Sequence, residues 1–108
     1  LFILNQIFEI EKKVERLNID NTIGRNIDKL KNFYENDFDE NTSFVVENPI
    51  TQKYSETRTD VEASISGDST ENLIITDVIK PIIRIKQGGT NQIIQNGIVV
   101  VQDSSTIQ

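Results

Sequence analysis

The spacing of apolar residues changes near residue 40. Before that point, apolar residues recur every three or four positions, which is the repeat of an amphipathic helix. After it they recur every two positions, or gather in short runs separated by Gly, Pro, Asn and Asp, as in strands joined by turns. We therefore predict an α+β chain, with a helical segment at residues 1–40 and a small antiparallel β domain at residues 41–108.

The first predicted helix covers residues 1–17, LFILNQIFEIEKKVERL, and contains neither Gly nor Pro. Its apolar residues follow spacings of four and three, at Ile3, Ile7, Ile10, Val14 and Leu17. That spacing is the a/d seam of a coiled coil. Leu4 and Phe8 widen the stripe, so the apolar face is broader than a two-stranded seam requires.

A second helix is predicted at about residues 23–36, after a turn at residues 18–22. It places Ile23, Ile27, Leu30 and Tyr34 on one side, and the polar run at 36–41 ends it. Two short amphipathic helices packed as a hairpin still leave one side apolar. A second copy of the chain would cover that side in a four-helix bundle. The alternative is that both helices cover the sheet of their own chain. The predicted homodimer interface consists of Ile3, Ile7, Ile10, Val14, Leu17, Ile23, Ile27 and Leu30.

Short strands are predicted at residues 42–47, 58–66, 73–80, 82–87, 92–95 and 98–102, because apolar and polar residues alternate there or form short apolar runs. Gly88 and Gly89 predict a turn with positive φ. Asn96-Gly97 is typical of a hairpin turn, but it would equally suit a kink or bulge within one strand. The last six residues, DSSTIQ, are expected to fray.

Composition excludes several classes of function. Eleven basic and seventeen acidic residues give a net charge of −6, and the acidic excess is the same in residues 1–40 and 41–108. Without a basic face, neither nucleic acid nor an anionic membrane surface is an expected partner. The chain has no Cys and no His, so a thiolate nucleophile, an imidazole base and a zinc knuckle are excluded. Lack of Cys fits a cytoplasmic protein, and no apolar run is long enough to span a membrane.

Two groups of carboxylates could in principle support chemistry. Asp37, Asp39 and Glu40 lie close together, but the stretch lacks the central Gly of a calcium-binding loop. Asp60 and Glu62 share one face of a predicted strand and could act as acid and base. Two acids on an exposed strand are more simply solvated, so this pair is the only support for an enzyme.

Two further motifs also have a simpler explanation than a catalytic or phosphate-binding site. The stretch KQGGTN at 86–91 lacks the residue order and the following helix of a phosphate-binding loop. Arg58 stands between Glu56 and Asp60, which predicts a surface ion pair of little energy. We therefore expect a binding or structural protein with no enzymatic activity, no cofactor and no metal, whose small sheet offers the contact surface.

The layout resembles the GrpE family, the nucleotide exchange factors of DnaK-type chaperones. The first helix is similar to the family's apolar helical segment, Glu62-Ala63 to the centre of its His-Glu-Ala-Val-type strand, and LIITDVIKP (73–81) to its penultimate strand. QIIQNGIVVV (92–101) is similar to its closing strand, although Gln92 and Gln95 stand where the family has two Arg. The resemblance covers most of the chain.

This resemblance implies a homodimeric co-chaperone whose β domain binds the nucleotide-binding domain of a DnaK-type chaperone and promotes ADP release. Arg84, Lys86, Gln92 and Gln95 are then the expected partner-binding residues. The alternative is a structural or adaptor dimer of the same shape that binds a different protein.

Overall fold

The computed structural model describes residues 1–17 and 21–106. The chain forms two compact units. The first, which we call the helical unit, comprises Leu1–Val46 and Arg84–Gln92. The second, the β unit, comprises Glu47–Ile83 and Ile93–Gln108. Strands β4 (Ile82–Gln87) and β5 (Thr90–Gln95) contribute residues to both, so the helices share their unit with the tip of a hairpin.

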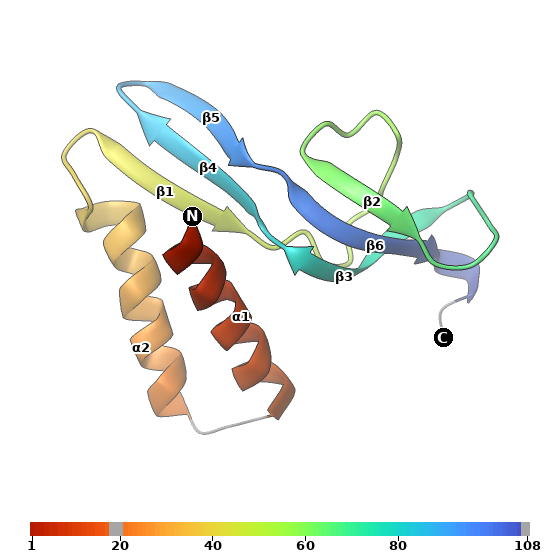
Figure 1. Cartoon of the computed structure of the whole chain (residues 1–108), viewed down its shortest axis with the longest axis horizontal. Helices are drawn as coiled ribbons and strands as arrows, with labels where there is room; N and C mark the ends of the chain where they lie inside the picture. Colours follow the sequence, from red (N-terminus) through yellow and green to blue (C-terminus); the bar gives the residue numbers. More distant parts are fainter. Residues whose placement is uncertain (18–20, 107–108) are drawn as a thin grey trace. The chain divides into compact units, whose positions relative to one another are not determined.

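The helical unit begins with two helices that run antiparallel, side by side: α1 (Phe2–Leu17) and α2 (Asn21–Asn32) (Figure 1). The Nζ of Lys31 lies 3.1 Å from Oε2 of Glu11 and joins the two helices. Both predicted helices are confirmed; of the turn predicted at 18–22, residues 18–20 lie outside the described part. No helix in residues 1–17 and 21–106 is both long and apolar enough to cross a membrane.

The predicted second helix extended to about residue 36, but α2 ends at Asn32 and continues as one wider π-helical turn, η1 (Phe33–Asp37). Aromatic rings lie along this turn. The ring centroid of Tyr34 is 6.0 Å from that of Phe44, and the ring of Phe38 is 5.0 Å from the same Phe44. Since Phe44 belongs to β1 (Thr42–Glu47), these edge-to-face contacts tie the end of the helical region to the first strand.

The strands form two three-stranded sheets, in the orders β1-β4-β5 and β2-β6-β3 (Figure 1). The second sheet consists of β2 (Val61–Ile65), β6 (Gly97–Asp103) and β3 (Leu73–Lys80). β3 is antiparallel to β6, but β2 is parallel to it. The prediction of an antiparallel domain is therefore wrong for this pair. Three other strands separate β2 from β6 along the chain, so no hairpin forces the direction to reverse.

The Asn96-Gly97 dipeptide is a kink, because β5 ends at Gln95 and β6 begins at Gly97 in the other sheet. Gly97 is buried, and a Cβ added to it would lie 3.1 Å from side-chain carbons of both Ile82 and Val61. Glycine is therefore favoured here by the tight space, and not by a positive φ. The hairpin turn of the chain is at Gly88 and Gly89, whose φ angles of 55° and 86° confirm that prediction.

The core of the β unit is aliphatic. β6 lies between its two neighbours and alternates between buried and half-buried residues along its whole length. Buried β-branched and Leu side chains from four strands pack there: Val61, Leu73, Ile75, Val78, Ile82, Ile83, Val99 and Val101. Leu73 of this core also lines the hollow described below.

Candidate functional site

The residues predicted for the dimer interface divide into two groups. Ile7 and Ile27 are each 4% exposed and belong to the core of the helical unit, together with Leu4 and Phe8. Val14 is half-buried. The remaining five are exposed: Ile3, Ile10, Leu17, Ile23 and Leu30.

These five exposed residues, which we call the helix stripe, keep a spacing of seven. Ile3, Ile10 and Leu17 lie on one line along α1, and Ile23 and Leu30 on one line along α2. Seven residues make nearly two helical turns, so each line runs almost parallel to its helix axis. A seven-residue apolar repeat is typical of a seam against another helix. Within one chain, the helix stripe is left facing solvent.

The four predicted partner-binding residues do not form one cluster. Arg84 and Lys86 are two positions apart on β4, and therefore project from the same face of that strand. Gln92 and Gln95 are three positions apart on β5, and therefore project from opposite faces. The Nε2 of Gln95 donates a hydrogen bond to the carbonyl oxygen of Pro81 at 3.0 Å. The structure thus brings together Arg84 and Lys86, and separates the two Gln residues.

The carboxylates that could have supported acid–base chemistry are not arranged as a catalytic pair. Asp60 is bound by Arg58, whereas Glu62 is exposed. Asp37, Asp39 and Glu40 are also exposed. Over the described ranges, no group of His, Cys, Asp and Glu lies close enough together to hold a metal ion. Residues 86–91 form the tip of the β4–β5 hairpin, and strand β5 follows the turn directly where a phosphate-binding loop would have a helix.

Arg58 organises the loop that leads into β2. Besides binding Asp60, its Nη1 donates to the side-chain oxygen of Gln52 at 3.2 Å and to the carbonyl oxygen of Lys53 at 3.0 Å. Hydrogen bonding to Asp60 raises the pKa of Arg58 above its ordinary value. The sequence predicted a weak surface pair, but the fork of the guanidinium closes a loop between residues 52 and 60.

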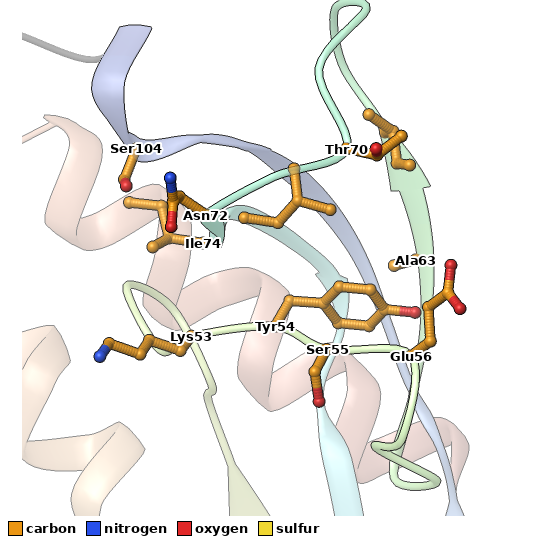
Figure 2. A pocket seen from close by; sticks show the side chains of 11 residues that line it. Lys53, Tyr54, Ser55, Glu56, Ala63, Thr70, Asn72, Ile74 and Ser104 are labelled. Carbon is orange, nitrogen blue, oxygen red and sulfur yellow. The ribbon is translucent and has the colours of Figure 1, made fainter.

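A hollow of about 860 Å³ lies beside this loop in the β unit (Figure 2). Tyr54 comes from the loop, and its ring extends toward Ala63 on β2 (Figure 2). Ile65 and Leu73 add aliphatic surface, while Lys53, Ser55, Glu56, Thr70, Asn72, Ile74 and Ser104 complete the lining. Sequence reasoning missed this hollow because its walls come from segments distant along the chain. The available signal was Tyr54, a large aromatic residue in an otherwise polar loop.

Asp103 anchors the end of β6 and was also missed. Its carboxylate accepts hydrogen bonds from the hydroxyl of Ser69 at 2.5 Å, and from the hydroxyl and backbone N–H of Ser105 at 2.6 and 2.8 Å. These bonds, those of Ser105 first, lower the pKa of Asp103. The prediction of a frayed end is therefore wrong for residues 103–105, while residues 107–108 lie outside the described part.

Comparison with protein-family models, curated proteins and solved structures gave no match to this chain. A functional assignment therefore rests on the helix stripe, the face of β4 and the hollow.

Proposed function

We propose that this protein is a non-enzymatic, homodimeric co-chaperone similar to GrpE. It binds the nucleotide-binding domain of a DnaK-type chaperone in the cytoplasm and promotes ADP release. It needs no cofactor, since the exchange of a bound nucleotide requires only binding.

The helix stripe is the observation that carries this proposal. Isolated exposed apolar residues are common on proteins, but five of them in two seven-residue lines are the pattern of a helical seam. A second copy would cover both lines at once in a four-helix bundle. The order of two helices followed by small sheets agrees with the layout of the family that the sequence resembles.

The proposed mechanism is a shift in the chaperone's conformational equilibrium. The β strands bind the open state of the nucleotide-binding domain more tightly than the closed state, and ADP then leaves faster. A 100-fold preference corresponds to about 2.7 kcal/mol, which lies within the usual range of coupling between two sites. Arg84 and Lys86, on one face of β4, provide the contact to an acidic surface of the chaperone.

The test is the release of a fluorescent ADP analogue from a purified DnaK-type chaperone. We expect the protein to accelerate release by about tenfold or more. Reversing both charges in an Arg84→Glu, Lys86→Glu variant should abolish most of the acceleration. The matched control is Arg25→Glu, Lys29→Glu, which makes the same charge change at two exposed positions of α2 and should retain it.

A second candidate is a structural or adaptor dimer that binds another protein. The opposite faces of Gln92 and Gln95 favour it, because these residues replace two Arg of the family and cannot both project toward one flat partner surface. An intact dimer that leaves ADP release unchanged would replace the exchange proposal with this one.

A further inference from the structure

Strand β2 lies at the edge of its sheet. In the order β2-β6-β3, the opposite edge is covered, because the segment before β2 pairs with β3. The N–H of Thr51 donates to the carbonyl of Ile75 at 2.8 Å, and the N–H of Tyr54 donates to that of Leu73 at 2.9 Å. Within the described residues, no such segment pairs with the outer side of β2, which is therefore the open edge of this sheet. Edge strands present rows of backbone donors and acceptors that can pair with another chain.

The direction of these backbone groups follows from the hydrogen bonds to β6. The carbonyl of Asp60 accepts from the N–H of Gly97 at 2.9 Å, and the N–H of Ser66 donates to the carbonyl of Val101 at 2.8 Å. Backbone direction alternates from residue to residue along a strand. The N–H and C=O groups of Val61, Ala63 and Ile65 therefore point away from β6, toward the outer edge.

The hollow opens beside the same residues. Ala63 and Ile65 line it together with Tyr54 and Leu73, and the Tyr54 ring spans the space toward Ala63 (Figure 2). A strand added along β2 would place every second side chain on the face of Ala63 and Ile65. A large aliphatic residue at such a position would enter the hollow, while the backbone pairs with β2.

The loop that carries Tyr54 forms one wall of the hollow, and it is held in place before any partner binds. Its backbone pairs with β3, and Arg58 bonds to Asp60, to Gln52 and to the carbonyl of Lys53. A wall fixed by these bonds loses little conformational entropy when a ligand binds.

Charge decides which kind of segment fits. The β unit contains three basic and eight acidic residues, whereas the helical unit contains eight and nine. The β unit thus carries a net charge of −5, although the acidic excess is even along the sequence. Exposed Glu56, Glu62 and Asp68 lie in or next to β2 and its flanking loops, and Lys53 is the one basic residue among those described that line the hollow. A basic segment is therefore favoured over an acidic one.

We propose that the edge of β2 and the hollow beside Tyr54 bind an extended protein segment in which a large aliphatic residue is flanked by Lys or Arg. The segment adds a strand to the sheet through Val61, Ala63 and Ile65. The test of this site can fail or succeed independently of the exchange activity, because it contains no chaperone.

The test uses the full chain and a labelled peptide of about seven residues, with Leu at its centre, Thr and Val around it, and Lys at both ends. Fluorescence anisotropy measures its binding. Three variants of this peptide are compared with it. One has Glu in place of Lys. The other two are N-methylated on alternate residues, so that each lacks the backbone N–H donors of one strand edge.

We expect the Lys peptide to bind about tenfold or more tightly than the Glu peptide. One N-methylated version should lose binding and the other should keep it, because only one edge of the peptide faces β2. Filling the hollow with Ala63→Phe should also abolish binding, while Ile79→Ser, at an exposed position of β3, should not. Equal binding of the Lys and Glu peptides, equal binding of both N-methylated versions, or no saturable binding up to about 1 mM would overturn the proposal.

Discussion

Arg58 donates two hydrogen bonds to the carboxylate of Asp60, from Nε to Oδ1 at 3.0 Å and from Nη2 to Oδ2 at 2.9 Å. Both side chains are about one-fifth exposed, at 21% and 20%. A partly buried, two-pronged pair of this kind is stronger than an ordinary surface ion pair. Because Arg58 also bonds to Lys53, the pair fixes the loop beside the hollow.

Arg58→Lys tests this role. Lysine keeps the charge but cannot reproduce the planar fork, so we expect the free energy of unfolding to fall by about 1–2 kcal/mol. Urea unfolding measures the change. The control is Arg25→Lys, the same substitution at an exposed position of α2, which should stay within about 0.5 kcal/mol of the parent. Equal stability of both variants would show that the fork contributes nothing.

Local patterns were sufficient for most elements of the fold. The predicted strands at 42–47, 73–80 and 82–87 match β1, β3 and β4 residue for residue, because apolar period and turn residues act over a few positions. The parallel pairing of β2 with β6 could not be obtained this way. It depends on contacts between residues more than thirty positions apart, which no local pattern specifies.

Gly97→Ala tests the close packing at the kink between β5 and β6. The added methyl group would meet Ile82 and Val61 at 3.1 Å and the carbonyl oxygen of Lys80 at 3.4 Å. Overpacking of this kind is expected to cost about 1–3 kcal/mol of unfolding free energy.

Gly24→Ala is the opposite case in the same molecule. A Cβ at Gly24, inside α2, meets no atom within 4 Å apart from its chain neighbours and the nearby backbone of its own helix. Alanine favours a helix interior over glycine by about 0.5–1 kcal/mol. Urea unfolding should therefore rank Gly24→Ala above the parent and Gly97→Ala below it. The reverse order would contradict the packing at Gly97.

Ile10→Asp tests the helix stripe. Ile10 is 45% exposed, so its replacement should leave the fold of one chain intact while placing a carboxylate in the seam of the proposed dimer. Sedimentation equilibrium should show a dimer for the parent and a monomer for the variant, and circular dichroism should show unchanged helix content. Ile79→Asp is the matched control, since Ile79 is 48% exposed on β3, and its dimer should persist. A parent that is monomeric would remove the dimer from the proposed function.

The candidate site was less accessible to sequence reasoning than the fold. Ile7 and Ile10 both belong to the a/d stripe, so the pattern does not distinguish them. Only tertiary packing decides that Ile7 is buried within its own chain while Ile10 is exposed. Similarly, the hollow requires Tyr54 and Ala63 to line the same space, and Tyr54 belongs to a loop that Arg58 holds by hydrogen bonds. Both outcomes follow from tertiary contacts that a periodic pattern does not contain.

Asp103→Asn tests the anchor at the end of β6. The folded-state pKa of Asp103 lies below its ordinary value because Ser105 and Ser69 donate hydrogen bonds to the carboxylate. The folded protein thus favours the charged form, so the stabilisation is present above the ordinary pKa of about 3.9 and is lost as the pH falls through the lowered pKa.

The amide side chain of the Asp103→Asn variant cannot ionise. The difference in urea midpoint between parent and variant should therefore be large at pH 7 and should shrink at pH values below about 4. Asp68→Asn, an exposed position in the preceding turn, should differ little from the parent at either pH. A difference for Asp103→Asn that is the same at both pH values would show that its hydrogen bonds do not favour the charged carboxylate.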